Sequence, residues 1–175
     1  MDADRPIKPG EGMDRPVERK EEIMINIRHA NIADAEEILE IQKLAYQSEA
    51  IIYNDWSIPP LTQTLEEIKQ GFAENTFLKA CESCKIIGSV KVSINNENHE
   101  IGRLIVHPDF QGKGIGTQLM LAVEAEFPMA KRFELFTGSK SVRNIHLYEK
   151  LGYKIFMRKQ LSELVELVFM EKYRQ

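Results

Sequence analysis

Three glycines spaced two residues apart are the part of this sequence whose residue types and spacing most clearly suggest chemistry. They follow a strand-like run and directly precede a helical run, in the segment Gln111, Gly112, Lys113, Gly114, Ile115, Gly116, Thr117. Glycine allows a backbone to approach a ligand closely and to adopt positive φ angles. The first amides of a helix have no partner within the helix and lie at the positive end of its dipole. The segment therefore predicts an anion site, and phosphate groups are common ligands of such sites.

The residue types exclude the two most familiar phosphate loops. A Walker loop requires serine or threonine after Gly-Lys, but Gly114 follows Lys113 here. A dinucleotide fingerprint counted from Gly112 requires a glycine where this chain has Thr117. A glycine-rich turn without a ligand would explain one glycine better than three. The sequence therefore favours a phosphate site of another kind.

Two short motifs resemble those of a known family. Residues 111–116 resemble the Gln/Arg-x-x-Gly-x-Gly/Ala pyrophosphate motif of the GNAT superfamily of acyl-CoA-dependent N-acyltransferases. Residues 144–153 resemble the family's Leu-Tyr-Glu-Lys-x-Gly-Phe segment. With the order of the elements, the resemblance covers residues 24–174. The family's Leu-x-Val strand matches the three residues Leu104, Ile105 and Val106.

The resemblance implies a site for acetyl-CoA as co-substrate, without a metal. The amides of residues 112–117 would bind the pyrophosphate, and the strand residues 104–106 would pair with the pantetheine arm. The Val106 amide would donate to the oxyanion of the transfer step. Many members have asparagine where this chain has Ser141, and alanine where it has Asn144. We therefore assign a cofactor contact to Asn144, with Ser141 as the alternative.

Two residues are candidates for the proton transfers. Tyr148 takes the place of the family's general acid, because a neutral phenol can protonate a departing thiolate. The alternative for Tyr148 is that it only packs or hydrogen-bonds to the cofactor sulfur. Glu100 begins the strand that carries Leu104, and period-two alternation puts it on the same face unless a bulge intervenes. It is the candidate base, with ordered water as base or a merely solvated carboxylate as alternatives.

The acceptor side is predicted in a long connection, residues 46–61, between two helices. Such a connection inside a compact domain is often a binding loop. Tyr53, Asp55 and Trp56 lie in it and combine aromatic rings with a carboxylate, which suits a cationic amine. The alternative is that the segment packs against its own core.

Hydrophobic periodicity predicts the elements that must position these residues. An amphipathic helix spans residues 35–45, and the capping box formed by Thr64 and Glu67 opens another. Short polar breaks separate three strands that we expect to form an antiparallel meander. We expect an α/β layered fold of the GNAT type, with a mixed, mostly antiparallel central sheet flanked by helices. The further predicted strands are 24–29, 76–81, 85–94, 100–106, 132–137, 153–157 and 164–170, and the further helices follow Gly116 and span 141–151.

Composition restricts the classes of protein to which this chain can belong. The chain has 175 residues and a formal net charge of −4, which argues against a broad nucleic-acid-binding surface. No apolar run is long enough for a membrane span. Cys81 and Cys84 are too few for a disulfide scaffold and lack the further ligands of a zinc site, which favours a cytoplasmic protein. Residues 1–22, rich in charges, proline and glycine, predict a disordered tail, and residues 23–175 a single GNAT-like acetyltransferase domain.

We therefore expect an N-acetyltransferase that moves acetyl from acetyl-CoA directly to a primary amine. A small or amino-acid-like amine is favoured over a protein. The alternatives are a non-catalytic acyl-CoA-binding sensor and a protein or peptide N-acetyltransferase. The strand predicted at residues 164–170 is a candidate to pair across a homodimer.

Overall fold

The computed structural model describes residues 24–174, so the tail predicted for residues 1–22 lies outside the described residues. The strands of the described range are Ile25–His29 (β1), Thr76–Glu82 (β2), Lys85–Asn95 (β3), Asn98–Val106 (β4), Arg132–Gly138 (β5), Lys154–Gln160 (β6) and Glu166–Tyr173 (β7). Its α-helices are Ala35–Ala45 (α1), Gln47–Tyr53 (α2), Pro59–Thr62 (α3), Leu65–Glu74 (α4), Ile115–Glu126 (α5) and Val142–Lys150 (α6).

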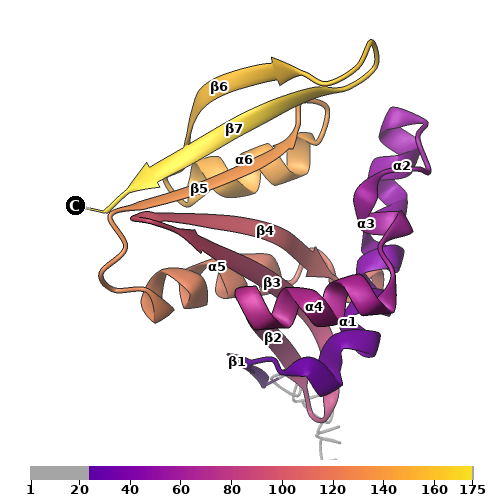
Figure 1. The fold of residues 1–175 in the computed structure, drawn as a ribbon, viewed down its shortest axis with the longest axis vertical. Coiled ribbons are helices and arrows are strands. Elements are labelled where there is room, and N and C mark those ends of the chain that lie inside the picture. Colours follow the sequence, from indigo (N-terminus) through magenta and orange to yellow (C-terminus); the bar gives the residue numbers. More distant parts are fainter. Residues whose placement is uncertain (1–23, 175) are drawn as a thin grey trace, which may run out of the picture.

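These strands form one seven-stranded sheet in the order β1-β2-β3-β4-β5-β7-β6 (Figure 1). The pairs β1–β2, β2–β3, β3–β4, β5–β7 and β6–β7 are antiparallel. The pair β4–β5 is parallel. This confirms the predicted mixed, mostly antiparallel sheet and its meander.

Strand β7 lies inside the sheet, between β5 and β6. Both of its edges are already hydrogen-bonded to neighbouring strands. The prediction that the strand near residues 164–170 pairs across a homodimer is therefore wrong, because a strand needs a free edge to add another. Among the described strands, β6 forms the edge at this end of the sheet.

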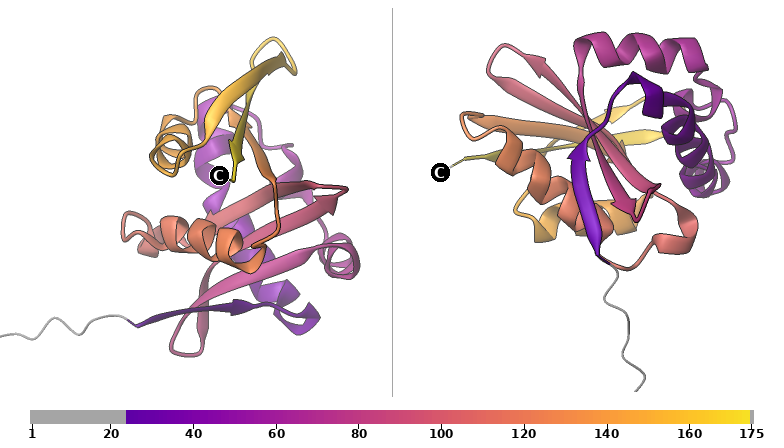
Figure 2. Two further views of the ribbon diagram at one scale, coloured as in Figure 1. Left: turned by 90° about the vertical axis from the view of Figure 1, so that its left-hand side faces the viewer. Right: turned by 90° about the horizontal axis from the view of Figure 1, so that it is seen from below.

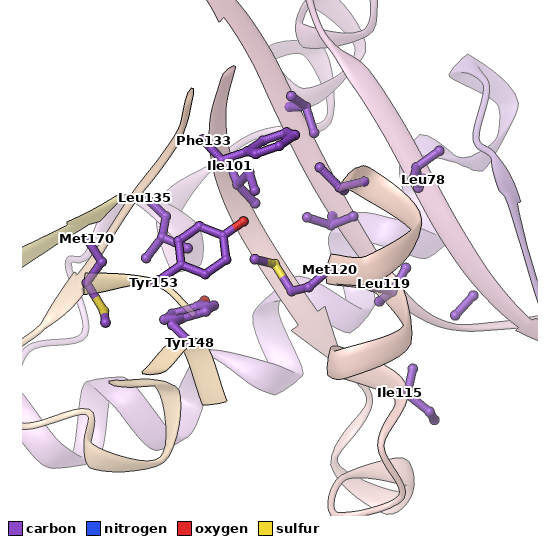
Figure 3. Close-up of a cluster of buried hydrophobic side chains, with 14 of the residues drawn as sticks. Leu78, Ile101, Ile115, Leu119, Met120, Phe133, Leu135, Tyr148, Tyr153 and Met170 are labelled. Atoms are coloured by element: carbon purple, nitrogen blue, oxygen red, sulfur yellow. The ribbon is translucent and has the colours of Figure 1, made fainter. Parts of the chain in front are cut away.

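Helices cover both faces of the sheet, with α5 and α6 on one face and α1 and α4 on the other (Figure 2). The larger core lies under α5 and α6, where Leu119 and Met120 of α5 and Tyr148 of α6 meet Phe133 and Met170 of the sheet (Figure 3). The second core joins α1 and α4 to the opposite face of the sheet. Burial of these two apolar helix faces is the main force that holds the layers together.

Strands β4 and β5 separate soon after they meet. They pair at Asn98 with Arg132 through Glu100 with Glu134, and no pairing between them follows in the described range. Strand β5 continues to Gly138 alongside β7, while β4 continues to Val106 alongside β3. The two ribbons diverge in Figure 1 toward the end of the sheet that carries α2 and α3. Beyond Glu100, the outer edge of β4 is thereby left without a strand partner in the part of the chain that the structure describes.

A bulge interrupts β4 at the point where this divergence begins. Between Ser89 and Lys91 strand β3 advances by two residues, while their partners run from Ile105 to Gly102, a step of three. The extra residue belongs to β4, where Arg103 has a φ of 51°. A bulge of this kind reverses the facing of the side chains beyond it.

The predicted long connection over residues 46–61 is not an open loop, because it contains α2 and α3. Helix α2 buries Ala50 and Tyr53 against the fold and ends at Asn54, whose φ of 50° is left-handed. Helix α3 begins with Pro59, a residue already suited to a first helical position. Tertiary packing rather than a strong local pattern makes this segment helical.

The capping box predicted before α4 is present. The amide of Glu67 donates to the Thr64 hydroxyl at 3.2 Å, and the amide of Thr64 donates to the Glu67 carboxylate at 2.7 Å. Two otherwise unpaired amides of the helix start are satisfied by this exchange.

Candidate active site

The glycine loop presents a row of unpaired amides. The first amide of α5 with a helical partner is that of Gln118, which donates to the Gly114 carbonyl at 3.0 Å. The amides before it, of residues 112–117, have no acceptor among residues 24–174. Ile115 is buried, so its contribution to a ligand would come from its backbone. The Lys113 ammonium lies 4.8 Å from the centre of the Phe110 ring, beside this row.

The backbone of this loop depends on two of its glycines. Gly112 has a φ of 76° and Gly114 a φ of 79°, values that other L-residues rarely adopt. A Cβ added to either would have no protein atom within 4 Å, so the space over both residues is open. Free amides beside open space fit the pyrophosphate of a coenzyme A molecule, which needs donors and room rather than side-chain contacts.

Val106 presents its backbone to the unpartnered edge of β4. Its neighbour Ile105 is paired with Ser89, and the amide of His107 donates to the Ile87 carbonyl at 2.8 Å. Because antiparallel ladders alternate, the N–H and C=O of Val106 point away from β3. The side chain of Gln111 donates to the Val106 carbonyl at 3.1 Å, and the Val106 amide is left facing the divergence of β4 and β5.

Gly116, in the first turn of α5, lies close to both β4 and α6. A Cβ added there would lie 3.4 Å from Leu147 of α6, 3.9 Å from Leu104 and 4.0 Å from Val106. The first turn of α5 therefore lies against both β4 and α6. The structure brings together the glycine loop, the Leu-x-Val strand and the helix that carries Tyr148.

Tyr148 is buried in the larger core, with its ring centre 6.1 Å from that of Tyr153 (Figure 3). Burial raises the pKa of the Tyr148 phenol, and the nearby Tyr46 and Glu49 raise it further. A phenol whose pKa lies above its usual value stays protonated at physiological pH. Tyr148 therefore has the protonation state that a general acid requires.

Glu49 of α2 links α2 to the start of α6. Its carboxylate accepts from the Ser141 hydroxyl at 2.5 Å and from the Asn144 side-chain amide at 3.5 Å. Ser141 is buried, while Asn144 is partly exposed. The two residues considered for a cofactor contact are thus both hydrogen-bonded to Glu49. Sequence reasoning did not find Glu49, because it lies on a helix that the pattern did not predict.

Glu100 does not share a face with Leu104, which corrects the expectation from simple alternation. Ile101 and Leu104 both contact the core under α5 and α6, so Glu100 points to the opposite face. The bulge at Arg103 is the intervening irregularity. Glu100 is exposed there, across from Ser93 of β3 and Glu134 of β5.

The three acceptor-side candidates have different surroundings. Tyr53 is buried over Gly138, and its hydroxyl accepts from the Lys140 amide at 2.8 Å. Asp55 accepts from the Ser57 hydroxyl and amide, which lower the pKa of its carboxyl. Trp56 is 58% exposed and available to a ligand. Tyr53 therefore has a packing role in this structure.

The two cysteines do not form a disulfide bond. Cys81 is buried, Cys84 is exposed, and both are free thiols beside the β2–β3 turn. Within residues 24–174, no group of His, Cys, Asp and Glu side chains is arranged to hold a metal ion. No helix in the same part of the chain is long and apolar enough to cross a membrane.

A sheet that opens beside a loop of free amides defines a fold of the GNAT class. PaiA N-acetyltransferase of Thermoplasma acidophilum, solved in complex with coenzyme A, has this fold with a TM-score of 0.73 and 20% identity over 86% of this chain and 99% of that chain. YncA of Salmonella typhimurium, solved with acetyl-CoA, gives a TM-score of 0.69 and 19% identity over 86% of this chain and 94% of that chain.

The chain belongs to the acetyltransferase (GNAT) family, because residues 35–153 match the sequence profile of that family. It is also 30% identical over 128 residues to UPF0157 protein YqkA of Bacillus subtilis (strain 168). That match covers 73% of this chain but only 37% of YqkA, so the chain spans little more than a third of its curated relative.

Proposed function

We propose that this protein transfers an acetyl group from acetyl-CoA directly to a primary amine of a small acceptor. The observation that carries the proposal is the row of unpaired amides at residues 112–117, next to the free edge of β4. The fold neighbours solved with coenzyme A and acetyl-CoA support the same ligand.

The loop and β4 hold the donor in this proposal. The amides of residues 112–117 bind the pyrophosphate, with Lys113 adding a positive charge beside them. The outer edge of β4 pairs with the pantetheine arm, as an added strand would. The Val106 amide then donates to the oxygen that gains charge when the amine attacks the thioester carbonyl.

Two side chains move protons. An amine has a pKa near 10, so it must lose a proton before it attacks. Glu100 accepts that proton, directly or through water, from the face of the sheet that carries α1 and α4. Tyr148 donates its proton to the thiolate as it departs. The acyl group passes from sulfur to nitrogen without a covalent enzyme intermediate.

The acceptor enters beside α2 and the segment that follows it. Trp56 is exposed there, and Asp55 carries a negative charge that suits an ammonium group. A carboxylate next to an exposed aromatic ring suits a small cationic amine.

The test combines ligand binding with transfer. Titration calorimetry measures the affinity for acetyl-CoA, and release of free thiol is then followed across amino acids, polyamines, aromatic amines and peptides. Gly114→Ala places a side chain at a φ of 79° and should weaken binding about tenfold or more. Gly71→Ala is the control, because the nearest atom to an added Cβ there is an ordinary 3.7 Å away.

The outcomes separate the functional classes. Binding that depends on Gly114 and transfer to small amines would support the proposal. Binding without transfer to any amine would identify a non-catalytic acyl-CoA sensor. Transfer to peptides alone would identify a protein-modifying enzyme, and equal binding by the two glycine variants would contradict the assigned site.

A further inference from the structure

We propose that Arg103 and Lys91 form a subsite for an anionic group of the acceptor, which is therefore a compact amine that also bears a carboxylate or a phosphate. The inference rests on the proposed function and names the chemical class of its acceptor.

The backbone at Arg103 is the first observation. Arg103 occupies the β4 bulge with a φ of 51°, a conformation that glycine and asparagine adopt with less strain. Strained positions cluster at sites where the geometry of a side chain serves function. The bulge follows closely after the last pair between β4 and β5, and the Arg103 side chain extends over the Tyr46 ring.

The charge of Arg103 is the second observation. No carboxylate of the described residues lies within ion-pair distance of it, whereas Arg132 pairs with Glu134 at 2.6 Å and Glu171 at 2.7 Å. Instead, the Arg103 guanidinium lies over the Tyr46 ring, 5.9 Å from its centre. Arg103 is partly buried, so its positive charge is less well solvated than that of a fully exposed arginine.

Lys91 adds a second cation at the same place. It is paired across the strands with Gly102, and its Cε lies 3.8 Å from where a Gly102 Cβ would be. Burial lowers the pKa of the Lys91 ammonium, the charge of Arg103 lowers it further, and Glu100 partly opposes this. Burial and the neighbouring Arg103 charge thus both disfavour the Lys91 cation, and an added anion would offset both effects.

The position of the pair fits an acceptor. Arg103 directly precedes Leu104, where the proposed donor site on β4 begins. Tyr46, under the guanidinium, is close enough to Tyr148 to affect its pKa. Glu100 lies on the face of β4 that Lys91 also contacts, so one face offers a carboxylate for the ammonium and two cations for the anion.

The experiment compares acceptors that carry the anionic group with analogues that lack it. Each kcat/KM is expressed per concentration of unprotonated amine, because loss of the anion also lowers the pKa of the amine. Thiol release is measured with glycine against glycinamide, β-alanine against its amide, and phosphoethanolamine against ethanolamine. We expect wild-type kcat/KM to favour one anionic member by about tenfold or more, and the carboxylate and phosphate arms show which anion is preferred. Arg103→Gln should abolish that preference by raising KM for the anionic acceptor, with its neutral partner unchanged.

Two further variants separate recognition from folding. Arg103→Lys keeps the charge and should restore part of the preference, and Lys91→Gln should reduce it without touching the strained backbone. Arg158→Gln, on the distant edge strand β6, is the matched control and should leave every ratio unchanged. Thermal melting checks that each variant is folded.

The failures are distinguishable. Acetyl transfer that does not discriminate the anionic from the neutral amines, or equal loss on both in Arg103→Gln, would overturn this inference alone. Absence of both acetyl-CoA binding and transfer would overturn the proposed function, and this inference with it.

Discussion

The Ser141 hydroxyl donates a 2.5 Å hydrogen bond to the carboxylate of Glu49, a residue 92 positions earlier in the chain. The bond joins α2, which borders the acceptor side, to the first turn of α6, which carries Tyr148. Glu49 also raises the pKa of Tyr148. One carboxylate thus affects both the position of α6 and the acidity of the phenol on it.

Glu49→Ala should lower the free energy of unfolding by about 1–3 kcal/mol, because Ser141 is buried and would lose a charged partner. Urea denaturation measures the change. Glu49→Gln keeps an acceptor for the hydroxyl and should recover part of the loss. Glu40→Ala, at an exposed position of α1, is the control for helix propensity. Equal stability of the Glu49 and Glu40 alanine variants would contradict the role of this bond.

Tyr148→Phe should reduce kcat by about 10²-fold, the usual contribution of a positioned general acid, with little change in KM for acetyl-CoA. Tyr153→Phe is the matched control, because this second buried tyrosine donates to Glu124 at 3.2 Å instead. Steady-state kinetics on both variants measure the difference. A Tyr148→Phe enzyme with nearly full kcat would assign the ring to packing alone.

The alkaline side of the pH profile tests the same phenol. Its pKa is raised, so the protonated, active form persists to higher pH than for an ordinary tyrosine, whose pKa is about 10. Activity limited by Tyr148 should therefore not fall as pH approaches about 10. A decline in kcat near neutral pH that disappears in Tyr148→Phe would show that the phenol ionises early.

Glu100→Gln should reduce kcat at neutral pH, and the loss should shrink as pH approaches the amine pKa of about 10, where the acceptor needs no base. The measurement is the kcat ratio of wild type to variant across pH. Glu134→Gln, at the paired position on β5, is the control. A ratio that is constant across pH would remove Glu100 as the base.

Asp34 and Lys79 form a 2.6 Å ion pair with both side chains largely buried. Burial acts to raise the pKa of the Asp34 carboxyl, but the Lys79 hydrogen bond and charge, with the Asn31 amide, lower it overall. The native fold thus binds the carboxylate form more strongly. This stability is present above the unfolded pKa of about 3.9 and is lost as pH falls below it toward the folded value.

Asp34→Asn should cost about 2–4 kcal/mol at neutral pH, and its deficit against wild type should shrink below about pH 4. Denaturant unfolding at several pH values measures both effects. Glu97→Gln is the control, because Glu97 pairs with Lys131 at the same 2.6 Å on the exposed surface, where such pairs contribute under about 1 kcal/mol. Similar costs for the two variants would contradict the argument from burial.

Most elements were predictable because their signals are local. The spacing of apolar residues predicted α1 and α5, and the Thr64–Glu67 exchange predicted the start of α4, since each depends on residues within a few positions. The sequence pattern did not predict helix α2, because this helix is stabilised by the burial of Ala50 and Tyr53 against the rest of the fold. The predicted orientation of Glu100 was wrong for a related reason. A strict two-residue alternation assumes a regular strand, and β4 contains an extra residue at its bulge.

The sequence by itself determined that three glycines precede a helix, that a Leu-x-Val strand comes before them and that Tyr148 follows on a later helix. These follow from residue type and short spacing, through backbone freedom and unpaired amides. Only the tertiary structure decided that β4 leaves β5, that Glu49 reaches Ser141, and that Arg103 lies beside Lys91 without a carboxylate partner among residues 24–174. Those relationships depend on strand pairing and packing between distant segments, which no local pattern specifies.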